Sequence, residues 1–185
     1  MMMMRSASRN NRGKKISQAE YGDHDIILYD NLADFREIYS YYCKEAFEPN
    51  NDIVLIATTY ESIHRVKSNL ESEGIDVPRR IGEGSLWVID SVKGYHMPDV
   101  YGLLKLARSL EARAEKEEKS GVAVFADMGS FFLLNKRKEL VDYEQSVPGR
   151  LNTKLKAFCC YHSDDFNTLA KPQKKMLLES HHVAV

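Results

Sequence analysis

Five short apolar runs alternate with longer stretches of helical periodicity, and this alternation limits the fold more than any other feature. The runs cover 24–30, 52–58, 85–91, 121–128 and 155–162. The connections between them are too long for hairpins, which favours parallel strands joined by helices. The sequence therefore predicts an α/β protein with three layers, in which helices flank a mainly parallel central sheet.

The segments between the runs carry the signals of helix ends. Asn31 is suited to cap the first helix, and Gly74 is suited to end the second. Pro98 suits the first turn of a long third helix, with a loop before it. Helices are expected at 31–47, 61–72, 98–119, within 130–147 and, as two short ones, after 163, with a last edge strand at 181–185.

Length and charge indicate a single domain with an unusual start. The 185 residues suffice for one well-formed core, and the net charge is −1. Residues 1–20 hold one acidic residue and five basic ones, which predicts a disordered basic leader before a domain over 21–185. The remainder is acidic without a basic stripe, so nucleic-acid binding is not expected. Neither a membrane span nor a secretory signal is evident, so we expect a cytoplasmic protein.

Cysteine and histidine spacing predicts neither a metal site nor a cofactor. Cys43, Cys159 and Cys160 are odd in number and lack CxxC spacing, which argues against a disulfide framework or a zinc site. The adjacent His181 and His182 would point to opposite faces of a strand. Buried packing is favoured over a nucleophilic role for the cysteines.

The turn after the second apolar run lies where α/β proteins often bind ligands, beyond the carboxyl ends of the strands. It reads ATTYES, whereas a phosphate-binding loop needs glycines and a lysine. Thr58, Thr59 and Tyr60 offer hydroxyl groups, and Glu61 adds a negative charge. Phosphate binding is therefore not expected, while helix capping and ligand contact both stay open for the threonines.

Acidic residues and tyrosines recur near the other strand ends. Asp127 ends the fourth run, where an ATPase would hold its magnesium-binding acid, although a helix cap is the favoured role. No spacing singles out a carboxylate pair for acid–base chemistry. Period two places Cys160 on one face of the fifth run and Tyr161 on the other. The tyrosines suit a pocket for a small, largely apolar molecule.

Several blocks of the sequence, in order, carry a family resemblance. They are HDIILYDNLADF, DIVLIATTYES, GSLWVIDSVKGYHMPD, GVAVFADMGSFF, DYEQSV, and LKAFCCYHSDDFNTLA with HHVAV. Together they resemble the MEDS domain, the methanogen/methylotroph DcmR sensory domain, over about residues 22–185. The resemblance implies a RecA/KaiC-like core without the phosphate-binding loop. In that core 52–58 would replace the strand before the loop, and 121–127 the strand with the magnesium acid.

The resemblance also implies a role in signalling or transcription control. We predict a non-catalytic sensory domain that binds a small ligand, hydrocarbon derivatives included, or a regulatory partner. A separate output protein, a kinase or a transcription factor, is expected because no output segment is evident. A degenerate RecA/KaiC-like nucleotide-binding protein and an oligomeric interaction module are the alternatives, and homo-oligomerisation stays open. The predicted ligand-binding residues are His24, Tyr29, Thr58, Thr59, Tyr60, Glu61, Tyr95, Glu144, Cys160 and Tyr161.

Overall fold

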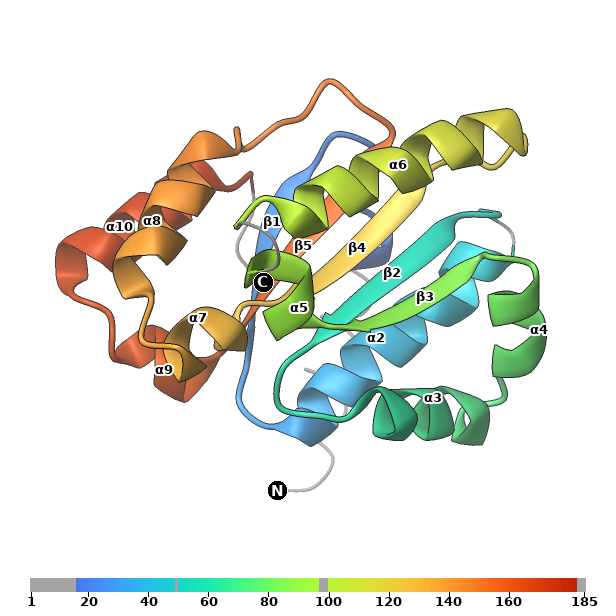
Figure 1. Ribbon diagram of the computed structural model, residues 1–185, viewed down its shortest axis with the longest axis horizontal. Coiled ribbons are helices and arrows are strands. Elements are labelled where there is room, and N and C mark those ends of the chain that lie inside the picture. The colour runs from blue at the N-terminus through green and yellow to red at the C-terminus, as the bar shows by residue number, and fades with distance from the viewer. Residues whose placement is uncertain (1–15, 49, 97–99, 183–185) are drawn as a thin grey trace.

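The computed structural model describes residues 16–48, 50–96 and 100–182, and its centre is one five-stranded sheet (Figure 1). The strands are β1 (His24–Tyr29), β2 (Ile53–Thr58), β3 (Leu86–Asp90), β4 (Val122–Asp127) and β5 (Leu155–His162). They lie in the order β1-β5-β4-β2-β3, and every neighbouring pair is parallel. The predicted parallel sheet is thus confirmed, with β1 and β3 at its edges.

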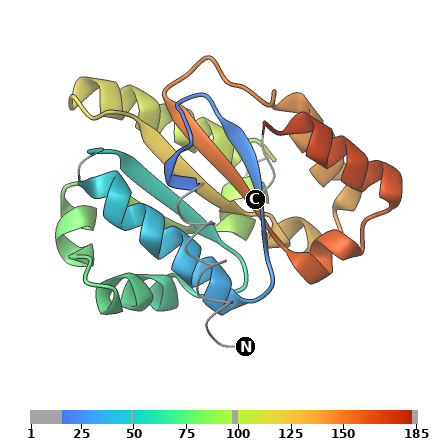
Figure 2. The ribbon, with the colours of Figure 1, turned by 180° about the vertical axis from the view of Figure 1, so that it is seen from behind.

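Helices cover both faces of the sheet, as Figures 1 and 2 show from opposite sides. One face carries α2 (Leu32–Phe47), α3 (Ile63–Ser72) and α4 (Val77–Gly82). The opposite face carries α5 (Ser91–His96), α6 (Gly102–Lys116), α7 (Gly129–Leu133), α8 (Arg137–Ser146), α9 (Ser163–Asn167) and α10 (Lys171–Ser180). This arrangement confirms the predicted α/β architecture and is consistent with its three layers.

Side-chain alternation along the strands divides the core between these two faces. On β5, Cys159 and Tyr161 face the α6 side, whereas Phe158 and Cys160 face the α2 side. β2 and β4 are buried at every position, as expected for central strands covered on both faces. Alternate residues along a strand therefore contact opposite helical layers.

Two local predictions need correction. A loop was expected after β3, but the chain there forms the helix α5. In this helix the ring of Tyr95 is buried against Phe131, a tertiary contact that the local sequence does not indicate. Helix α4 was not predicted, although Asp76 caps it by accepting from the backbone N–H of Arg79. Pro98 lies outside the described residues.

The two ends of the described chain also differ from the predictions. His181 and His182 follow α10 without forming a strand, and residues 183–185 lie outside the described part. Within the predicted leader, Ile16 is buried against the α2 side of the core. Residues 1–15 are not described, so the disordered leader stays a prediction.

Candidate functional site

The first group of predicted site residues surrounds Asp127 at the carboxyl ends of the strands. Its Oδ1 accepts from the backbone N–H of Gly129 at 3.0 Å and from the Tyr29 hydroxyl at 3.3 Å. Its Oδ2 accepts from the backbone N–H of Thr59 at 2.9 Å. Burial raises the pKa of Asp127, and these hydrogen bonds offset only part of the rise. The carboxylate thus joins the end of β1, the turn after β2 and the start of α7.

Tyr60 and Glu61 occupy the region where a phosphate would approach. The Tyr60 ring covers Gly129 so closely that an added Cβ would overlap a ring carbon. Its hydroxyl donates to Oδ2 of Asp165 at 2.5 Å. Glu61 accepts from Nε of Arg36 at 2.7 Å, so its charge is paired within the protein. Both side chains are thus engaged by other residues of the protein, and the absence of phosphate binding at this turn stays a prediction.

The threonines of this turn do not cap the helix that follows. Ser62 caps α3 by accepting from the backbone N–H of Arg65. The hydroxyl of Thr58 donates to the carbonyl of Glu61, and that of Thr59 lies 2.5 Å from the Ser91 hydroxyl. Both hydroxyls are thus used to hold the turn in shape.

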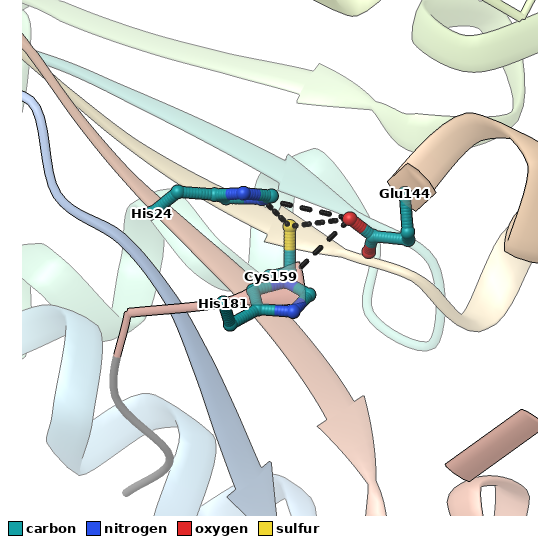
Figure 3. A group of neighbouring side chains, drawn as sticks. All are labelled: His24, Glu144, Cys159 and His181. Carbon is teal, nitrogen blue, oxygen red and sulfur yellow. Dashed lines mark hydrogen bonds and ion pairs between the residues drawn. The ribbon is translucent and has the colours of Figure 1, made fainter. Parts of the chain in front are cut away.

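A second group of polar side chains meets on the α6 side of the sheet, away from the carboxyl ends of the strands (Figure 3). His24 comes from the start of β1 and Cys159 from the middle of β5. Glu144 lies near the end of α8, and His181 follows α10 directly. We call these four residues the buried cluster. Four separate segments of the chain are needed to form it.

The buried cluster is tightly spaced. Nε2 of His24 lies 3.2 Å from Sγ of Cys159 and 3.5 Å from Oε2 of Glu144. The same carboxylate oxygen lies 3.7 Å from Sγ and 3.5 Å from Nε2 of His181. The two imidazole rings are stacked at a tilt, with centroids 4.2 Å apart. One donor or acceptor atom from each residue falls within 4.8 Å of all the others.

Burial controls the charges in this cluster. Burial raises the pKa of Glu144, but the hydrogen bond from His24 and the nearby imidazoles reverse this, so the pKa ends below its usual value. Burial lowers the pKa of His181 and raises the pKa of Cys159. At neutral pH the cluster therefore contains a carboxylate, a neutral thiol and a neutral His181. A lone buried carboxylate among such groups is costly unless several partners stabilise it.

Outer hydrogen bonds hold two members of the cluster in place. The hydroxyl of Tyr161 donates to Oε1 of Glu144 at 2.5 Å. Nδ1 of His181 lies 2.6 Å from the carbonyl oxygen of Leu177, which can only accept, so Nδ1 carries the proton. Nε2 of His181 is then an unprotonated nitrogen, buried without a hydrogen-bond donor among the described residues. Nδ1 of His24 is likewise buried without a partner there.

Aromatic rings pack beside the buried cluster. Tyr95 meets Tyr143 edge-on at 5.3 Å and Phe131 at 5.0 Å between ring centroids. The hydroxyl of Tyr95 donates to Sδ of Met128 at 3.0 Å. The ring centroids of Tyr161 and Phe132 lie 6.4 Å apart. These rings adjoin the cluster through Tyr161, which donates to Glu144, and through Tyr143, which precedes Glu144 in α8.

The predicted site residues thus separate into two groups. The buried cluster and its surroundings include His24, Tyr95, Glu144 and Tyr161, and the turn around Asp127 includes Tyr29, Thr58, Thr59, Tyr60 and Glu61. Cys160 lies outside the buried cluster, because it faces the α2 side and its thiol donates to the carbonyl of Phe158. It adjoins the other group instead, since it pairs with Asp127 across β4 and β5 and its carbonyl accepts from the backbone N–H of Met128. Cys159 takes its place in the cluster, and strand parity with Tyr161 was the signal for it. His181 had no local signal, since only the tertiary fold brings it to β1.

Together these features define an α/β protein whose polar centre is buried between the sheet and a helical layer. The family model of the MEDS domain, "MEthanogen/methylotroph, DcmR Sensory domain", matches residues 23–171, and the chain belongs to this family. The match includes three members of the buried cluster and ends before His181. The comparison with curated proteins finds no match.

Among the described residues, no helix combines the length and apolar character that crossing a membrane requires. The family match supports a sensory role. The relation to RecA/KaiC-like proteins stays a prediction.

Proposed function

We propose that this chain is a non-catalytic sensory domain that binds a small ligand at the buried cluster. The observation that carries the proposal is Glu144, a fully buried carboxylate with polar neighbours from β1, β5 and the segment after α10. Buried titratable groups with perturbed pKa values concentrate at functional sites. Unpaired nitrogens on His24 and His181 leave hydrogen-bonding capacity that a ligand can use.

The surroundings suggest the chemistry of the ligand. The rings of Tyr95, Tyr143 and Phe131 supply an apolar side, while Glu144 and the imidazoles supply polar contacts. Such a combination suits a small, mostly apolar molecule with one polar group. A short-chain hydrocarbon derivative meets this description and agrees with the sensory role of the family.

The position of His181 offers a route for signalling. The backbone N–H of His182 donates to the carbonyl of His24 at 2.7 Å, so the segment after α10 is fastened to β1 beside the cluster. A ligand that contacts His181 would stabilise the conformation in which this segment is bound to β1. The size of the shift equals the difference in the ligand's affinity for the bound and released conformations. A separate kinase or transcription factor would read the change on α10, which packs against α8.

The test begins with native mass spectrometry of gently purified protein, which should reveal a bound small molecule. Thermal unfolding is then followed with a panel of short-chain alcohols, aldehydes and halogenated methanes. At least one probe should raise Tm for the wild type and for Asp127→Asn, but not for Glu144→Gln. The proposal fails if no molecule is bound and no probe separates Glu144→Gln from the wild type.

A nucleotide-binding protein without the phosphate loop is the alternative function. Tyr60 over Gly129 and the internally bonded Asp127 count against it. A titration with ATP and Mg²⁺ tests it directly. A large rise in Tm that disappears in Asp127→Ala would favour nucleotide binding over the small-ligand proposal. A cytoplasmic location and a homo-oligomer stay predictions, as does an interaction module as the third function.

A further inference from the structure

The spacing within the buried cluster resembles the ligand shell of a tetrahedral ion. Zinc binds nitrogen and oxygen at about 2.0–2.2 Å and thiolate sulfur at about 2.3 Å. In a tetrahedron these bond lengths put ligand atoms about 3.3–3.6 Å apart. Four of the six separations among the ligand atoms of His24, Glu144, Cys159 and His181 run from 3.2 to 3.7 Å, and all four atoms lie within 4.8 Å of one another (Figure 3).

The orientation of the His181 ring gives a second, independent observation. Its Nδ1–H donates to the Leu177 carbonyl, so Nε2 is the nitrogen directed at the other three residues. Nε2 is buried without a hydrogen-bond partner among the described residues and lies 3.5 Å from Oε2 of Glu144. A cation between these two atoms would bond to both. Metal-binding histidines commonly donate their second ring N–H to a carbonyl in this manner.

We propose that His24, Glu144, Cys159 and His181 bind one divalent transition metal ion of the zinc type. Binding as such stands on the geometry alone, whereas its role in sensing rests on the proposed function. The inference reverses the sequence prediction of no metal site. Sequence spacing could not reveal the ligands, because they come from four separate segments of the chain.

The donor set selects the class of metal. Magnesium and calcium prefer oxygen ligands, whereas two imidazoles and a thiolate favour zinc and its neighbours in the transition series. Binding requires the Cys159 thiol to lose its proton, which passes to the solvent. The thiolate and the Glu144 carboxylate together balance the two positive charges of the ion. The complete site is then neutral, which allows its burial.

Tyr161 would act as a positioning residue for this site. Its hydroxyl holds Oε1 of Glu144 and thereby leaves Oε2 directed at the other three ligands. Such outer hydrogen bonds typically change metal affinity about 10–100-fold when removed. The ion would also join the segment after α10 to β1, β5 and α8 through one centre.

The experiment measures metal content and ligand type on the full chain. Protein produced with added zinc and dialysed extensively should contain about one zinc per chain by inductively coupled plasma mass spectrometry, as expected for one four-ligand site. After removal of zinc with a chelator, Co²⁺ is titrated in. A thiolate-to-cobalt charge-transfer band and the strong visible bands of tetrahedral Co²⁺ are expected.

Cys159→Ala and Cys160→Ala form a matched pair, because the two cysteines are adjacent and both buried but face opposite sides of the sheet. Cys159→Ala should lose the charge-transfer band, and Cys160→Ala should keep it. His181→Ala, altered outside any helix or strand, should weaken Co²⁺ binding at least about tenfold. Circular dichroism checks that each variant is folded. If Cys159→Ala does not fold, the Co²⁺ affinity of His181→Ala tests the metal proposal instead.

Absence of stoichiometric zinc together with absence of the cobalt band overturns the metal proposal. So does a band that persists in Cys159→Ala or an affinity unchanged in folded His181→Ala. The small-molecule panel, repeated on the zinc-loaded and chelated protein, separates the two proposals. Metal binding without any probe-induced shift refutes the sensing proposal alone, and a probe-induced shift without metal binding refutes the metal proposal alone.

Discussion

The Tyr161 hydroxyl donates to Oε1 of Glu144 at 2.5 Å, and both side chains are completely buried. Tyr161→Phe removes this donor and leaves a buried carboxylate oxygen unpaired. We expect a loss of about 1.5–3 kcal/mol in the free energy of unfolding at neutral pH, measured with urea. Tyr41→Phe, on a half-buried position of α2, is the control and should change little. An equal effect of the two substitutions would contradict the importance of this hydrogen bond.

A buried ion pair at the amino ends of β2 and β5 gives a second prediction. Nζ of Lys156 lies 3.5 Å from Oδ2 of Asp52, and the two side chains are 7% and 0% exposed. Lys156→Met removes the cation and should destabilise the fold by about 3 kcal/mol, since Asp52 then keeps the hydroxyls of Tyr21 and Tyr42 as its side-chain donors among the described residues. Lys154→Met, two residues away and exposed, should have a small effect. Comparable urea midpoints for both variants would refute the expectation.

The contact between Tyr60 and Gly129 predicts a coupled effect. A methyl group at 129 would overlap the ring, so Gly129→Ala should destabilise the protein by about 1–2 kcal/mol. Tyr60→Ala removes the obstacle, and the double variant should therefore lose much less than the sum of the two single changes. A double-mutant cycle from urea unfolding measures this coupling. Additive effects would show that the ring simply moves aside.

The raised pKa of Asp127 predicts how stability depends on pH. Between its unfolded pKa near 3.8 and its higher folded pKa, the folded state holds the proton more often. Stability from this group is therefore greatest at low pH and declines as pH rises through that window. The wild type should lose stability relative to Asp127→Asn as pH rises from about 3.8. Parallel pH profiles of the two proteins would contradict the shift.

Much of the fold was predictable because the signals are local. The strands of an internal parallel sheet are buried on both faces, so they appear as continuous apolar runs, and the fifth run matches β5 at both ends. Asn31 caps α2 as its side chain and position suggested. Helices α4 and α5 were missed because they are short and held by tertiary contacts such as Tyr95 with Phe131.

The candidate site was only partly predictable, for a geometric reason. Ligands were expected beyond the carboxyl ends of the strands, yet the buried cluster lies over one face of β1 and β5. Among the predicted ligand-binding residues, His24 and Glu144 belong to the buried cluster and Tyr161 adjoins it, whereas Cys160 was chosen although Cys159 shares the face of Tyr161. His181 depends on the path of the chain after α10, which no periodicity records.

The distance along the chain between His24 and His181 has a consequence for biosynthesis. His24 emerges early from the ribosome, whereas His181 follows only after all five strands have been made. A nascent chain therefore holds at most three members of the cluster until translation has passed α10. Any occupant that needs all four side chains must be acquired after that point, from whatever the cell then supplies.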